Sequence, residues 1–198
     1  MFKASLLLFF VVLMTSNSQA YNLDDWPCVQ RYIPELSANV VWQQQPNKQN
    51  PQLSEPVAQQ NIVSLSTDLR TDIVLFENTI NDYLDQNKEV IGLRNLLFYD
   101  IFESIQSKRS RILKGIFRYS AKQQKLAIRI DQQRVAISAA LKSDKLDPAM
   151  LEDLQARQAW DSRAFRERRE QLVHLCEKPV KLEQRLFFIA QALGAKTP

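Results

Sequence analysis

Glycine, cysteine and histidine are scarce in this 198-residue chain, which contains three, two and one of them, respectively. With so few glycines, the sequence offers no glycine-rich loop that could cradle a phosphate group. One histidine is too few for a di-iron helical bundle, which needs a Glu-x-x-His motif on each of two helices. Two cysteines and one histidine also leave a tetrahedral zinc site one ligand short. We therefore expect no metal, no cofactor and no enzymatic activity.

Residues 1–20 have the features of a secretory signal peptide. Lys3 supplies the positive charge, Leu6 to Met14 is an unbroken apolar run, and Ser18-Gln19-Ala20 places small residues at the cleavage site. We expect cleavage after Ala20 and a periplasmic or secreted mature protein. The alternative is that this segment is kept as an anchor, although it is shorter than the roughly 20 apolar residues that span a bilayer.

The two cysteines, Cys28 and Cys176, lie far apart in the sequence. In an oxidising compartment two such cysteines most simply form one disulfide bond. Two buried free thiols and a bridge between two chains are the alternatives. The sequence has no Cys-x-x-Cys motif, so it shows no sign of thioredoxin-type redox chemistry or of covalent haem attachment.

Residues 21–56 contain five of the eight prolines and the polar run Gln43 to Asn50, a composition typical of an irregular arm. Trp26 and Trp42 lie in this arm. We expect both side chains to pack into the body of the fold. The alternative is an exposed aromatic docking motif on a flexible arm.

From residue 57 onward apolar residues recur at helical spacing, and we interpret residues 57–198 as one helical bundle domain. The pattern predicts helices over about 57–85, 88–141, 148–176 and 180–193, with Asn87 capping the second helix and Pro179 separating the last two. A heptad repeat runs through the second helix. Its members are Ile91, Phe98, Ile105, Ile112, Tyr119 and Leu126, with Phe102, Ile116, Ile130 and Ile137 in a second register.

The lengths of these helices predict an all-α, elongated antiparallel bundle or hairpin around one very long central helix of about 80 Å. Helix 57–85 would pair with the first half of this central helix, and helix 148–176 with its second half. The first half then belongs to a thicker body, and the second half forms a two-helix prong with helix 148–176. We expect the Cys28–Cys176 bridge to lie between them near Gly115, and Trp160 to lie in the prong's seam opposite Leu126 or Ile130.

The basic residues are concentrated in the prong. Between residues 118 and 169 twelve basic residues face seven acidic ones, a surplus of roughly five, whereas the whole chain has a formal charge of +4. Arginine predominates on the second helix of the prong, which favours recognition of carboxylates or phosphates, because its planar fork binds both bidentately. The candidate contacts with a partner are Arg118, Lys122, Lys125, Arg129, Arg157, Arg163, Arg166, Arg168 and Arg169. The alternative is a solvated helical pair held by contacts such as Arg163 with Glu167.

These features predict an exported, non-catalytic interaction protein, such as a scaffold, an adaptor or a holding chaperone. Its partners would be acidic or unfolded envelope proteins, with an anionic membrane surface as a further candidate, and export argues against nucleic acid. The design is similar to that of exported chaperones with basic helical arms, with which it shares no motif. An accessory subunit of a secretion or pilus assembly is the second hypothesis, and a ligand-binding or enzymatic bundle is the third. The sequence leaves the oligomeric state open.

Overall fold

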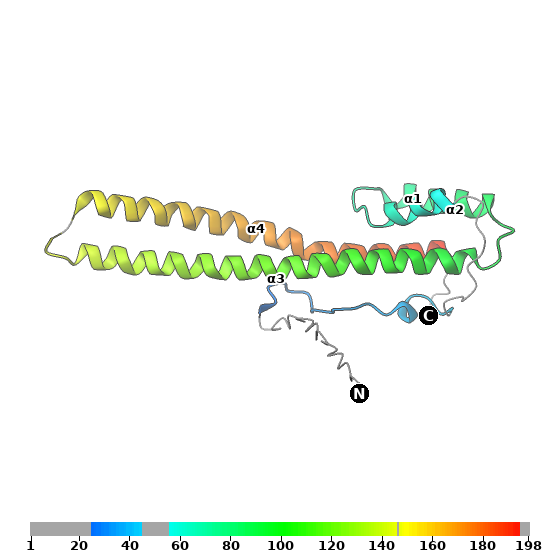
Figure 1. The fold of residues 1–198 in the computed structure, drawn as a ribbon, viewed down its shortest axis with the longest axis horizontal. Coiled ribbons are helices and arrows are strands. Elements are labelled where there is room, and N and C mark those ends of the chain that lie inside the picture. The colour runs from blue at the N-terminus through cyan, green and yellow to red at the C-terminus, as the bar shows by residue number, and fades with distance from the viewer. Residues whose placement is uncertain (1–24, 45–55, 146, 195–198) are drawn as a thin grey trace, which may run out of the picture.

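The structure, a computed structural model, describes residues 25–44, 56–145 and 147–194. These residues form a short 3-10 turn, η2 (Ala38–Val40), and four helices, α1 (Pro56–Ser66), α2 (Ile73–Gln86), α3 (Leu93–Leu141) and α4 (Pro148–Ala192). No strand occurs among them. The all-α hairpin around one very long helix is therefore confirmed (Figure 1). The predicted signal peptide and the part of the arm at 45–55 lie outside the described residues.

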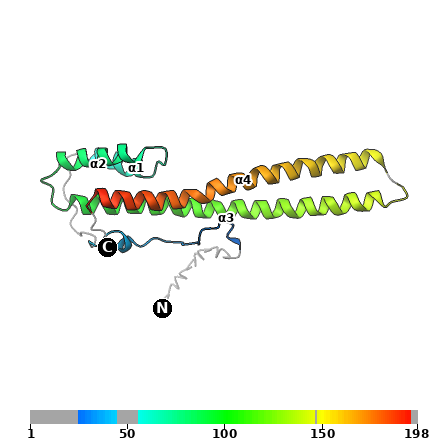
Figure 2. The same ribbon diagram turned by 180° about the vertical axis from the view of Figure 1, so that it is seen from behind.

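Helices α3 and α4 form the long axis of the molecule. They have 49 and 45 residues, or about 74 and 68 Å, and they lie side by side along their whole length (Figures 1 and 2). Asp147 caps α4, because its carboxylate accepts hydrogen bonds from the backbone N–H groups of Ala149 and Met150 at 3.0 and 3.3 Å. Pro148 follows at the first helical position, where its missing N–H is not needed.

The predicted break between helices 148–176 and 180–193 is wrong, since α4 continues through Pro179. A proline inside a helix removes one hydrogen bond and bends the axis, and α4 does change direction near its middle (Figure 2). On the far side of the proline, Leu182, Leu186 and Ile189 are buried in the core. Burial of this continuous stripe outweighs the one lost bond, and α4 therefore accompanies both halves of α3.

The predicted helix 57–85 is also wrong, because it consists of two helices, α1 and α2, that form a hairpin. Asp68 and Asp72 interrupt it by binding nearby backbone N–H groups, those of Arg70 for Asp68 and of Val74 and Leu75 for Asp72. The Arg70 side chain also binds Asp68 and lowers the pKa of that carboxyl group to about 2. Asp72 is thus the N-cap of α2.

The long helix begins five residues later than the predicted start at residue 88. Asn87 ends α2 instead of capping α3, and Gly92 precedes α3 with a φ of 79°, a left-handed conformation that suits glycine. Ile91, the first member of the predicted heptad, consequently lies outside the helix and is 91% exposed.

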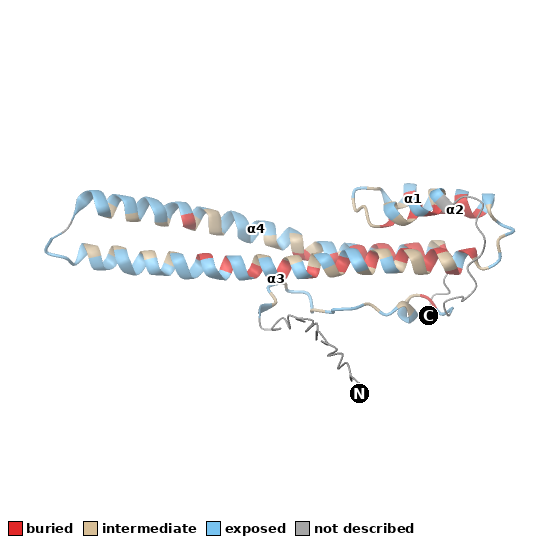
Figure 3. Cartoon of the chain, viewed as in Figure 1, coloured by how far each residue is buried: buried red, intermediate tan, exposed pale blue. Residues whose placement is uncertain are grey.

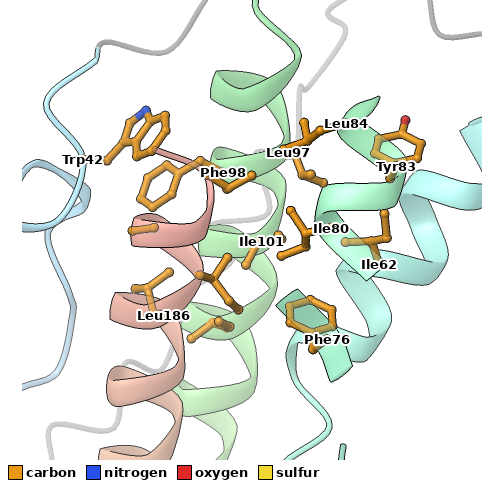
Figure 4. Packing of buried hydrophobic residues seen from close by; sticks show 14 of the residues in the cluster. Trp42, Ile62, Phe76, Ile80, Tyr83, Leu84, Leu97, Phe98, Ile101 and Leu186 are labelled. Atoms are coloured by element: carbon orange, nitrogen blue, oxygen red, sulfur yellow. The ribbon is translucent and has the colours of Figure 1, made fainter. Parts of the chain in front are cut away.

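The hydrophobic core lies in the half of the molecule that α1 and α2 cover, which we call the body (Figure 3). Ile80 of α2, Leu97 and Ile101 of α3 and Leu182 of α4 are completely buried in one cluster (Figure 4). In the other half, between residues 127 and 175, Asp161 is the one described residue that is buried. A pair of helices without a third layer cannot remove both faces of its seam from water.

The arm runs along α3 in the opposite direction to that helix. Near its start Trp26 and Tyr32 pack on Phe117, with ring centroids 5.3 Å away in both cases. At its end the Trp42 ring stacks on Phe98 at 4.6 Å and donates a hydrogen bond from Nε1 to Asn95 Oδ1 at 2.7 Å. The prediction that Trp42 is buried is confirmed, since 2% of this residue is exposed. Trp26 is only partly buried.

A disulfide joins Cys28 to Cys176 with 5.7 Å between their Cα atoms, as the sequence predicted. The neighbouring contacts of Trp26 and Tyr32 with Phe117 place this bridge close to Gly115, where the body meets the prong. The start of the α1–α2 hairpin lies farther along the body than this bridge, because Gln59 of α1 binds Asp100 of α3.

Two buried arginines tie the peripheral segments to the long helices. Arg109 of α3 is 2% exposed, and it binds Glu183 Oε1 of α4 at 2.6 Å and the carbonyl of Pro34 in the arm at 3.3 Å. Arg185 of α4 donates to the carbonyls of Thr71 and Leu65, at 2.8 and 3.3 Å, and lies over the ring of Phe76. Burial lowers the pKa of Arg185.

Candidate protein-binding prong

The prong comprises residues 118–141 of α3, the turn, and residues 148–169 of α4. All nine candidate contact residues lie on its surface with exposed side chains. They come from both helices, and they surround the part of the α3–α4 pair that neither the arm nor the α1–α2 hairpin covers (Figure 3). The structure therefore brings them together on one half of the molecule.

Most of these charges are not neutralised within the chain. Three prong arginines form ion pairs, Arg129 with Asp161, Arg134 with Asp131 and Arg157 with Asp153. The other nine basic residues of the prong take part in no ion pair with a described residue, and this includes Arg163, whose proposed pairing with Glu167 is not formed. The prong thus carries a set of exposed cations without an ion-pair partner among the described residues.

The seam between the two prong helices is unusually polar. Gln123 donates a hydrogen bond to the carbonyl of Phe165 at 3.2 Å. Further out, Asp161 accepts hydrogen bonds from Arg129 Nε and Nη2, at 2.8 and 2.6 Å, and from Gln133 Nε2 at 2.8 Å. These bonds, with Arg129 the largest contributor, lower the pKa of Asp161. Because each bond needs one particular partner, the seam specifies how α3 and α4 are aligned.

Replacement of Asp161 by asparagine is expected to destabilise the protein in a pH-dependent way. The folded-state pKa of Asp161 lies below its unfolded value, so its contribution to stability is present above about pH 4 and is lost as the pH falls through the folded pKa. The difference in urea stability between wild type and Asp161→Asn should therefore be largest at pH 7 and should shrink as the pH falls below about 4. A difference that does not change with pH would contradict this role.

The prediction that Trp160 lies in the seam is wrong, since this residue is 69% exposed. Asp161 occupies the inward position next to it. The heptad spacing could have indicated that Asp161 faces inward, since Leu154, Asp161 and Leu175 are separated by seven and fourteen positions.

Two open grooves flank the seam. One is lined by Ala127, Ile130, Asp131, Arg134, Ser162, Phe165 and Arg166, and the other by Arg129, Gln133, Ala156, Arg157, Trp160 and Asp161.

The grooves and the surface around them combine apolar and basic groups. Phe165 and Ile130 lie in one groove and Trp160 in the other, each beside arginines. Exposed apolar side chains continue along the prong at Ile128, Val135, Leu141 and Met150. Such a surface can bind a segment that carries both carboxylates and apolar side chains, because arginine forks bind carboxylates while the apolar groups lose water contact.

Neither protein-family models, nor curated protein sequences, nor solved structures give a match to this chain, so its function is inferred from its own residues. No helix among the described residues is long and apolar enough to cross a membrane. Within the same part of the chain, no three His, Cys, Asp or Glu side chains gather as a metal site would require. The fold and the prong define the protein as an all-α helical hairpin with a disulfide-anchored arm.

Proposed function

We propose that this is an exported, non-catalytic interaction protein that holds acidic or partly unfolded protein partners on its basic prong. The observation that carries the proposal is the contrast between the two halves of α3. In the body its side chains are buried under α1, α2 and the arm, whereas in the prong they remain open and basic. The body supplies stability, and the prong supplies surface.

Three properties of the prong suit it to partner proteins. Its unpaired cations attract carboxylates over a range of about 8 Å at physiological salt. Its grooves and exposed apolar side chains offer contacts that a folded acidic surface or an unfolded segment can use. Its length, about 35 Å for 24 residues of α3, allows several separate contacts with one extended partner.

The proposal of export is supported by the pattern at residues 1–20 and by the cysteine pair. A disulfide persists in an oxidising compartment and is rare in the cytosol. The bridge also holds the arm at the base of the prong, which leaves the basic half of the hairpin uncovered.

Replacement of Arg163, Arg166, Arg168 and Arg169 by glutamine is expected to reduce partner capture by about tenfold or more, since four exposed charges are removed together. Stability should stay within about 0.5 kcal/mol of wild type, because these side chains are on the surface. Affinity purification from envelope extracts, with partners quantified by mass spectrometry, measures the capture.

The matched control replaces Lys108, Arg111, Lys114 and Lys178, four exposed cations of the body, by glutamine. It changes the net charge equally but should leave capture intact. Equal loss in both variants would reduce the effect to overall charge, and unchanged capture in the prong variant would refute the proposal. Cross-linking in intact cells then separates a broad set of partners, expected for a holding protein, from a single stoichiometric complex, expected for an assembly subunit.

A further inference from the structure

The molecule has a stepped profile, and we call the open side of α4 in the prong, next to the end of the α1–α2 hairpin, the step. The hairpin of α1 and α2 stands on one side of the α3–α4 pair and covers the body alone, so the same side of the prong is open (Figures 1 and 2). In both views α4 is the prong helix nearest to that side. A partner that packs on this open side of α4 must itself carry a protruding surface that fits beside the α1–α2 hairpin.

The raised surface of this chain has the opposite charge to the prong. From residue 56 to residue 89 six acidic residues face two basic ones, a surplus of roughly four negative charges, against roughly five positive charges in the prong. On α2 the charges are acidic alone, and Glu77, Asp82 and Asp85 are all exposed. Val74 and Leu75 are exposed on the same helix, at 60% and 62%.

We propose that a second copy of this chain docks in the step, with α2 of each protomer on the outer side of α4 in the prong of the other. A twofold axis that passes close to Cys176 gives a closed dimer, because the α2 surface and the prong of each copy are both used. Acidic α2 then meets the arginines of α4, and the exposed apolar side chains of α2 and Trp160 are covered.

The positions along the helices agree with this pairing. Arg185, which binds the turn before α2 and lies over Phe76, is nine residues beyond Cys176, or about 13 Å. After rotation by 180° about the axis, α2 of the second copy lies beside roughly residues 153–166 of α4, at 1.5 Å per residue. Arg157, Trp160, Arg163 and Arg166 all fall in that stretch, opposite Glu77, Asp82 and Asp85.

Sedimentation velocity on the mature, disulfide-bonded protein tests the proposal from about 1 µM to about 100 µM, a range that detects micromolar association. Wild type should form a dimer that weakens at high salt. Either reversal set, Glu77→Lys with Asp82→Lys or Arg157→Glu with Arg163→Glu, should weaken association by about tenfold or more. An equimolar mixture of the two variants should associate again, because both interfaces of the mixed dimer pair opposite charges.

The control is the reversal Lys108→Glu with Lys114→Glu on the body, which should leave the dimer intact. A monomer at all concentrations, or a dimer that neither reversal weakens, would overturn the proposal. The proposed function is tested separately by the α2 variant, which keeps the whole prong and should still capture partners. Capture by a monomeric wild type would refute the dimer and retain the function.

Discussion

Replacement of both Cys28 and Cys176 by serine is expected to lower the free energy of unfolding by about 4 kcal/mol. The bridge closes a loop of 148 residues, and the chain-entropy account predicts a cost of about 5 kcal/mol for a loop of this size, near the upper end of measured effects. For a protein of this length the melting temperature should fall by roughly 10 °C. Urea unfolding of wild type with and without a reductant measures the same quantity without any mutation.

The doubly substituted protein and reduced wild type should unfold at the same urea concentration, which separates loss of the bridge from an effect of the serines. Helix content should change little below the transition, because the core of α1, α2, α3 and α4 does not include the bridge. A change in stability under about 1 kcal/mol would mean that packing alone holds the arm in the folded protein, and that the bridge restricts the unfolded chain very little.

The second large effect is expected at Trp42. Replacement by alanine should cost about 3–5 kcal/mol, the range for a buried tryptophan, because it removes the stack on Phe98 and leaves a cavity under the end of the arm. Replacement by phenylalanine keeps a ring on Phe98 and loses the hydrogen bond to Asn95, so it should cost less, about 1–2 kcal/mol. Equilibrium unfolding in urea measures both values.

Trp26→Ala is the matched control, since it removes a tryptophan from the same arm at a partly exposed site beside the disulfide. It should cost clearly less than Trp42→Ala. If the two alanine variants lost equal stability, the arm would be held as one unit by the disulfide and the Trp42 pocket would have no separate role.

The sequence predicted the elements whose signal is local. The heptad repeat located the long helix, Asp147-Pro148 located the start of α4, and two lone cysteines behind a predicted export signal predicted the disulfide. The nine basic contact residues were predicted as a surface, and all of them are exposed. Helix periodicity and charge are sufficient for these inferences, because an amphipathic stripe indicates its own buried face.

The errors arose where a local rule competed with packing. Pro179 is a helix breaker in isolation, yet α4 passes through it because burial continues on both sides, at Cys176 before the proline and at Leu182 and Leu186 after it. Trp160 looked like a seam residue by its hydrophobicity, yet Asp161 takes the inward position because Arg129 compensates its charge there and Gln133 donates a further hydrogen bond. Such outcomes depend on neighbours from distant parts of the chain.

By itself the sequence determined the helical class, the long antiparallel pair, the cysteine pair and the basic half of the molecule, all of which follow from periodicity and composition. Only the tertiary structure decided where the third layer lies. It folded residues 56–86 back into a hairpin over the body and laid the arm along α3, because Arg185, Arg109 and the pocket for Trp42 bind them there. These contacts join residues 53 to 120 positions apart, and the position of this third layer leaves the prong open.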